Sequence, residues 1–151
     1  MYGYSSASIK KIGNKVCFNA GITNCNSSEA SGYYHMAQCY MKLGNFAKAS
    51  ENYEIYLDKA KGIDRKILAL AIVDSLIKQG NYDKALELVK LYDKNDKSSK
   101  GRYDKEFRQY HITILEKQGN YAEALNRAKD YVSVYTDDEA MKKEVAFLET
   151  R

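Results

Sequence analysis

The sequence is poor in the residue patterns that build catalytic and metal sites. Its 151 residues include no tryptophan, no proline, two histidines and three cysteines. It contains no glycine-rich phosphate loop, no nucleophile elbow and no His-Glu-x-x-His motif. His111 falls in the middle of a helical run, where a core or groove position is more common than a catalytic one. We therefore expect no catalytic residue, no metal site and no cofactor, and we do not expect an enzyme.

Strong charge and long hydrophobic runs are also lacking. The net charge is +4, from 24 basic and 20 acidic residues spread along the chain, which disfavours a dedicated nucleic-acid binder. The longest apolar stretch covers residues 67–73 and ends at Asp74, so no membrane insertion is expected. Residues 1–4 open a polar segment with no apolar signal core. This predicts a cytoplasmic protein, or an exported or cell-envelope one if the chain is a fragment of something longer.

The three cysteines give little support for a disulfide framework. Cys17, Cys25 and Cys39 are odd in number and form no Cys-x-x-Cys pair. Cys17 and Cys39 fall at helical positions that favour small residues, where a free cysteine behaves as a small hydrophobe. We expect free thiols, with an incidental disulfide as the alternative.

What the sequence does contain is one short turn, written three times. The copies are Leu43-Gly44-Asn45-Phe46, Gln79-Gly80-Asn81-Tyr82 and Gln118-Gly119-Asn120-Tyr121. An alanine follows each turn at the same spacing. The glycines are 36 and 39 residues apart, a period typical of stacked helical hairpins.

The chemistry of this turn suits the junction of two helices. A glycine just past a helix adopts the left-handed conformation without a Cβ penalty. The asparagine that follows caps the next helix by accepting a backbone N–H hydrogen bond. A Gly-Asn pair also occurs in β-hairpins, but the flanking apolar residues recur at helical spacing. The sequence therefore predicts three antiparallel helix hairpins.

These units resemble tetratricopeptide (TPR) repeats over roughly residues 30–136. The first unit matches through Tyr33, Met36, Ala37, Tyr40, Gly44, Asn45, Phe46, Ala49 and Tyr53. The second matches through Ala69, Ile72, Leu76, Gly80, Asn81, Tyr82, Ala85 and Val89. The third matches through Ile112, Leu115, Gly119, Asn120, Tyr121, Ala124 and Ala128. No unit has the family's closing proline, and Tyr56, Tyr92 and Tyr131 replace its last alanine.

The expected fold is an all-α solenoid of about three TPR-like antiparallel helix hairpins in one domain, residues 1–151. Its parts are a leading partial repeat (6–28), repeats 1 (29–62), 2 (63–100) and 3 (101–136), and a C-terminal capping helix (137–151). The helix near 6–22 is either an orphan second helix or an unrelated cap or tail. A capping box with Thr136 as N-cap and Glu139 three residues on is expected to start the last helix. The tyrosines expected at core positions are Tyr53, Tyr82, Tyr92, Tyr121 and Tyr131.

The resemblance implies a function in protein–protein interaction. First helices of such repeats line a concave groove that holds a peptide or helix of a partner. The groove residues implied by the register are Tyr34, Gln38, Met41, Lys42, Leu70, Asp74, Ile77, Lys78, Gln109, Thr113, Glu116 and Lys117. A carboxylate clamp made of lysines and asparagines is not supported, because no asparagine accompanies Lys42, Lys78 or Lys117.

Two other functional hypotheses stay open. One is an RNA-binding helical repeat, which the near-neutral charge disfavours. The other is the C-terminal structural part of a larger TPR protein, stacked on upstream repeats. If neither upstream repeats nor a partner covers it, the N-terminal edge is expected to self-associate.

Overall fold

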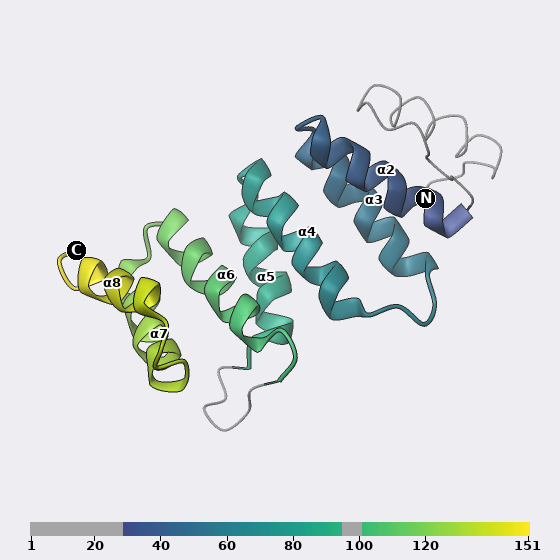
Figure 1. Ribbon diagram of the computed structural model, residues 1–151. Coiled ribbons are helices and arrows are strands. Elements are labelled where there is room, and N and C mark those ends of the chain that lie inside the picture. The colour runs from purple at the N-terminus through teal and green to yellow at the C-terminus, as the bar shows by residue number, and fades with distance from the viewer. Residues whose placement is uncertain (1–28, 95–100) are drawn as a thin grey trace. The chain divides into compact units, whose positions relative to one another are not determined.

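The described chain is helical throughout. The computed structural model describes residues 29–94 and 101–151, and the predicted partial repeat at residues 6–28 lies outside them. The chain divides into two compact units, Met1–Gly80 (unit 1) and Asn81–Arg151 (unit 2). Unit 1 contains α2 (Glu29–Lys42), α3 (Phe46–Lys59) and α4 (Arg65–Gln79) (Figure 1). Unit 2 contains α5 (Tyr82–Tyr92), α6 (Asp104–Lys117), α7 (Tyr121–Val134) and α8 (Glu139–Leu148).

Within each unit, helices that follow one another along the chain pack together. In unit 1, α2 packs on α3 and α3 on α4. In unit 2, α5 packs on α6, α6 on α7 and α7 on α8. This consecutive packing confirms the prediction of an all-α, repeat-like fold. In the described residues, no helix is both long and apolar enough to cross a membrane.

The three repeated turns have the predicted geometry. Gly44, Gly80 and Gly119 have φ values of 73°, 82° and 75°, in the left-handed region. After Gly44 and Gly119, the next backbone N–H reaches back five residues, from Asn45 to the Tyr40 carbonyl at 2.9 Å and from Asn120 to the Leu115 carbonyl at 2.8 Å. These bonds satisfy carbonyls that the end of a helix leaves unpaired.

The asparagines of the turns are N-caps, also as predicted. The Oδ1 atoms of Asn45, Asn81 and Asn120 accept hydrogen bonds from backbone N–H groups three residues on, at 3.2, 3.4 and 3.4 Å. Helix α4 begins differently, because Asp64 caps it by accepting from the N–H groups of Lys66 and Ile67. One side chain at each turn therefore supplies a hydrogen-bond partner to a helix start that would otherwise lack it.

Small residues allow the helices to approach closely. The alanines that the repeat pattern places at helix contacts are fully buried: Ala37, Ala49, Ala69, Ala85, Ala124 and Ala128. Larger apolar side chains fill the space beside them. In unit 1 these include Tyr33, Met36 and Ile55, and in unit 2 one cluster joins Ile112 and Leu115 of α6, Tyr131 of α7 and Leu148 of α8.

The start of α8 differs from the prediction. Thr136 is not its N-cap. The helix begins at Glu139, and Asp138 caps it by accepting a hydrogen bond from the Met141 N–H at 3.1 Å. The Tyr131 hydroxyl donates to the other carboxylate oxygen of Asp138 at 2.6 Å. This contact from α7 favours Asp138 over Thr136 as the N-cap. No local sequence pattern contains a contact between residues of different helices.

The tyrosines divide between core and surface. Tyr53 and Tyr131 are buried as predicted, and Tyr82 and Tyr92 are half-buried. Tyr121 was expected in the core, but it is 38% exposed and its ring lies beneath the Arg151 guanidinium, with 5.5 Å between guanidinium carbon and ring centroid. At the first position of a helix the side chain lies at the rim, where an amphipathic ring keeps one face in water.

We expect replacement of Gly119 by alanine to destabilise the protein by about 1 kcal/mol, because a non-glycine residue in the left-handed region carries a steric cost. An added Cβ would meet nothing within 4 Å, so the loss comes from the backbone and not from a clash. Urea unfolding measures it. Gly119→Asn is the matched control, since asparagine tolerates this conformation better. An alanine variant as stable as the wild type would contradict the assignment.

Candidate functional site

The twelve predicted groove residues share one pattern of exposure. In each first helix, the first three predicted residues are partly buried and the lysine that follows is exposed. The partly buried ones are Tyr34, Gln38, Met41, Leu70, Asp74, Ile77, Gln109, Thr113 and Glu116. The exposed ones are Lys42, Lys78 and Lys117. None is buried in the core, so each of these helices presents the same register of side chains at its surface. The sets on α2 and α4 belong to unit 1, and the set on α6 belongs to unit 2.

In unit 1, Tyr34 joins α2 to the tyrosines of α3. Its ring centroid lies 5.9 Å from that of Tyr53 and 5.3 Å from that of Tyr56. Its hydroxyl accepts a hydrogen bond from the Gln38 amide, 3.1 Å away and one turn further along α2. Tyr34 is therefore held by contacts on both sides, which limits the rotamer freedom that a contact residue would lose on binding.

Tyr53 of α3 is buried, and the pKa of its phenol responds to groups on both α2 and α4. Burial, the Tyr34 phenol and the Asp74 carboxylate together raise the pKa of Tyr53 to about 12. Like an ordinary tyrosine, the side chain is protonated at physiological pH. Tyr53 was expected in the core and Asp74 at the groove. Tyr53 is 6% exposed, so α3 contributes a buried ring that packs against Tyr34 and not a surface group.

Asp74 and Lys78 form an ion pair on α4. Their Oδ2 and Nζ atoms are 2.9 Å apart, and both side chains are partly exposed. The Lys78 ammonium also lies 5.8 Å from the centroid of the Phe46 ring. An exposed pair one turn apart contributes little to stability, so both charges remain accessible to a partner at little cost. We call the surface formed by Tyr34, Gln38, Asp74 and Lys78, with the buried Tyr53 ring packed against Tyr34, the tyrosine face.

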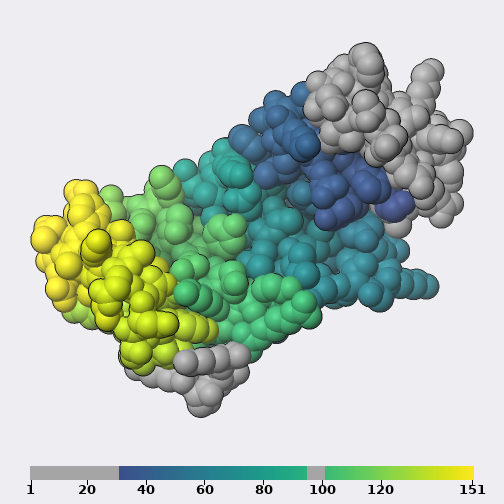
Figure 2. Space-filling model, in the orientation of Figure 1, coloured from purple at the N-terminus to yellow at the C-terminus, as the bar shows by residue number. Residues whose placement is uncertain are grey.

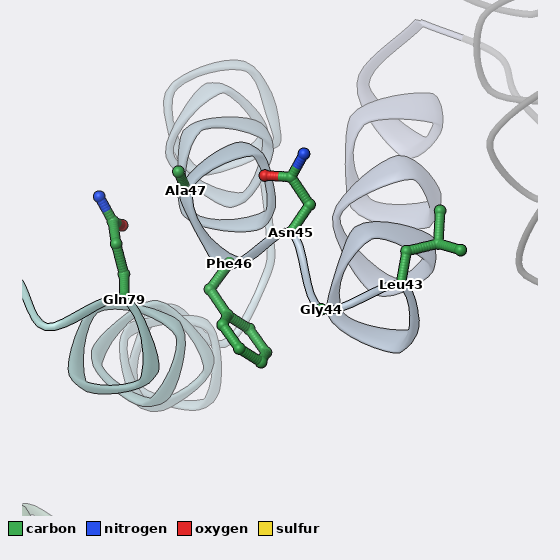
Figure 3. Close-up of a pocket in the computed structure, with 6 residues that line it drawn as sticks. All are labelled: Leu43, Gly44, Asn45, Phe46, Ala47 and Gln79. Carbon is green, nitrogen blue, oxygen red and sulfur yellow. The ribbon is translucent and has the colours of Figure 1, made fainter.

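An open hollow lies beside the tyrosine face. It has a volume of about 430 Å³ and is lined by Leu43, Gly44, Asn45, Phe46, Ala47 and Gln79. In Figure 3 the Phe46 ring extends towards the end of α4, while Leu43 points away from it. No pattern in the sequence predicted this hollow. The sequence feature that could have indicated it is Phe46, the aromatic residue of the turn. This residue was interpreted only as part of the repeat pattern.

The groove residues of unit 2 have different surroundings. The Gln109 amide donates to the Tyr131 hydroxyl at 2.9 Å, and this hydroxyl donates to Asp138. The Lys105 ammonium lies 3.5 Å from the same Asp138 oxygen. These bonds engage Gln109 in holding α6, α7 and α8 together. Chiefly because of the hydrogen bond from Tyr131, the pKa of Asp138 is lowered.

Glu116 faces a second carboxylic acid. Burial, then the charge of Glu144 on α8 and a hydrogen bond with it, raise the pKa of Glu116 to about 7, while the Lys117 ammonium opposes the rise. Glu144 was absent from the sequence prediction. A helix after the last turn carries no repeat signature to align it with the earlier first helices.

His111 is a buried structural residue of unit 2. Both it and Asp93 are 2% exposed at the side chain, and the His111 Nδ1 atom lies 2.6 Å from Asp93 Oδ2. The Arg127 guanidinium reaches the same oxygen at 3.3 Å. Asp93 ends α5, so this cluster ties the end of α5 to α6 and α7. In the described part of the chain, no group of three or more His, Cys, Asp or Glu side chains is arranged to hold a metal ion. Cys39 is a buried free thiol, and burial raises its pKa.

No protein-family model matches the sequence, and a search of curated proteins finds no significant match.

We expect Asp138→Asn to destabilise the protein by about 1 kcal/mol at pH 7, because the hydrogen bonds to a charged acceptor become weaker neutral ones. Asparagine keeps the capping function, so the loss reports on Tyr131 and Lys105. Since the pKa of Asp138 is lowered by folding, its contribution is complete above the ordinary value of 3.8 and is lost as the pH falls through the folded value.

Chemical denaturation at pH 7, 5 and 3 measures this difference, and the gap between variant and wild type should shrink at the lowest pH. Asp137→Asn is the matched control, because Asp137 is the exposed neighbour. A gap that does not depend on pH would show that the Asp138 charge plays no part.

Proposed function

We propose that this chain is a TPR-like interaction module and that the tyrosine face of unit 1 binds an extended peptide or a helix of a protein partner. The observation that carries the proposal is the set of exposed or partly buried side chains on the first helices of unit 1: Tyr34 and Gln38 on α2, and Asp74 with Lys78 on α4. The buried Tyr53 of α3 packs against Tyr34 and holds its ring. Tyrosines held by neighbouring rings are the kind of rigid contact residue found at binding hot spots.

The chemistry of this face suits a peptide. Gln38 and the Tyr34 hydroxyl are hydrogen-bonding groups for backbone amides and carbonyls. Asp74 and Lys78 offer one charge of each sign to polar side chains of the partner. The phenol rings supply apolar area at a small cost in side-chain entropy. The small net charge of the chain supports a protein over a nucleic acid as the partner, since the phosphate backbone dominates nucleic-acid affinity.

The hollow beside the face extends the same proposal. Lys78 connects the two, because it pairs with Asp74 and lies over the Phe46 ring. A partner segment along the tyrosine face would place an apolar side chain against Phe46, which is partly buried at the edge of the hollow.

We expect a peptide selected from a random displayed library against the full chain to lose at least tenfold in affinity when Tyr34→Phe, Gln38→Ala and Asp74→Ala are combined. Tyr34→Phe is used because the ring packs on Tyr53 and Tyr56, and truncation to alanine would also remove that packing. Calorimetry measures the affinity, and circular dichroism confirms that the variant is folded. The matched control changes three exposed residues, Glu51, Asp58 and Lys61, to alanine.

An equal loss of affinity in the control and in the tyrosine-face variant would place the binding surface elsewhere. If the library yields no binder while single-stranded RNA binds with a steep salt dependence, the chain is a nucleic-acid-binding repeat instead.

A further inference from the structure

Two aromatic side chains of unit 2 lie at the surface. Tyr121, at the first position of α7, is 38% exposed, and Phe147, in the last turn of α8, is 46% exposed. Figure 2 shows α8, coloured yellow, at the surface of the molecule. An exposed ring forgoes the free energy that its burial would contribute, so the contacts that these two rings make at the surface need an explanation.

One guanidinium lies against both rings. The Cζ atom of Arg151 is 4.5 Å from the centroid of the Phe147 ring and 5.5 Å from that of the Tyr121 ring. Both distances lie within the range of about 6 Å over which the face of a ring attracts a cation. In the described residues, the other cations over aromatic rings each contact one ring: Lys48, Lys59, Lys78, Arg102 and Lys105. The two exposed rings therefore form one cation site, to which α7 and α8 each contribute a side chain.

The backbone after α8 positions the occupant of this site. The Thr150 N–H donates to the Phe147 carbonyl at 3.1 Å, and the Arg151 N–H donates to the Leu148 carbonyl at 3.2 Å. Leu148 is 2% exposed and belongs to the apolar cluster that joins α6, α7 and α8. The segment that carries Arg151 is thus anchored to the core of unit 2, while the Arg151 side chain itself is exposed.

The nearest carboxylate along the chain is engaged elsewhere. Glu149 pairs with Lys129 of α7, with 2.8 Å between Oε1 and Nζ. Arg151 is therefore held by its backbone and by the two rings, and not by that carboxylate. A cation–π contact between exposed groups is weak, so the guanidinium can leave the rings without disturbing the buried core.

We propose that Tyr121 and Phe147 form a binding site for an arginine side chain of a protein partner, and that Arg151 is an internal occupant which the partner's arginine displaces. Arg151 defines the chemistry of the ligand, because a guanidinium is planar, always charged and stacks on aromatic faces. Both rings are open to solvent, whereas pockets for free small molecules bury most of the ligand. A side chain carried by a larger partner therefore fits this site. The site lies in unit 2, so the inference does not rest on peptide binding by the tyrosine face.

Arg151 sets the apparent affinity of this site. It competes with the partner's arginine for the same two rings, so the apparent dissociation constant is the intrinsic one divided by the fraction of molecules whose rings are free. Arg151→Gln removes the competitor and keeps a polar side chain in its place. We expect this change to raise the affinity for a guanidinium by about three- to tenfold.

Titration of the full chain with N-acetyl-arginine amide, followed by NMR of the phenylalanine rings, tests the proposal. The chain has four phenylalanines, and the Phe147 signal is the one that disappears in Phe147→Leu. In Arg151→Gln this signal should shift to saturation, with a dissociation constant about three- to tenfold below that of the wild type. The neutral N-acetyl-glutamine amide should leave it unchanged.

Lys143→Gln is the matched control, because Lys143 is an exposed cation of α8 and its loss changes the net charge by the same amount. It should retain the wild-type affinity. Adding Tyr121→Leu to Arg151→Gln should weaken binding by at least about threefold, since leucine keeps an apolar contact but has no aromatic face.

Four results would each overturn the proposal. One is a Phe147 signal that does not respond to capped arginine in Arg151→Gln. Another is an equal response to capped lysine or capped glutamine, which would show that the rings do not select a guanidinium. The others are a gain of affinity in Lys143→Gln as large as that in Arg151→Gln, and an affinity that Tyr121→Leu leaves unchanged.

Discussion

The structure depends on one local constraint, which is the reversal of the chain at a left-handed glycine. At Gly44, Gly80 and Gly119 the backbone ends one helix, and the next residue caps the following one. In the α2–α3 and α6–α7 hairpins, this short connection requires two helices to lie side by side with little room between them. Only small side chains fit there, which explains why Ala49 and Ala124, three residues after the aromatic residue of each turn, are fully buried.

The tyrosines determine how the edges of these cores are completed. A phenol that packs its ring inside brings a hydroxyl to the rim, where it needs a hydrogen-bond partner. In unit 2 those partners are aspartates: Asp138 for Tyr131, at 2.6 Å, and Asp104 for Tyr135, at 2.7 Å. Arg108 lies 2.7 Å from the same Asp104 oxygen and compensates its charge. A chain with no tryptophan thus fills its cores with tyrosine and places carboxylates around them.

The sequence was sufficient for the features that depend on neighbouring residues. The turns, their caps and most helix boundaries follow from residues within one helical turn of each other. It was insufficient where distant residues meet. The cap at Asp138, the pairing of His111 with Asp93 and the contact of Glu116 with Glu144 each join side chains from different helices. No periodic pattern contains such pairings, because they depend on how the helices pack.

The same distinction separates scaffold from surface. The buried positions recur from one helix-hairpin repeat to the next, because close helix spacing allows few residue types there. The exposed positions of the same register do not repeat: Tyr34, Leu70 and Gln109 are equivalent, as are Gln38, Asp74 and Thr113. In unit 1 these positions contribute a phenol, an amide and an ion pair, whereas in unit 2 they contribute a bonded glutamine and a carboxyl group whose pKa is raised. Packing imposes no choice at these positions. This divergence agrees with the proposal that α2 and α4 contact a partner, whereas Gln109 of α6 is bonded to Tyr131 of α7.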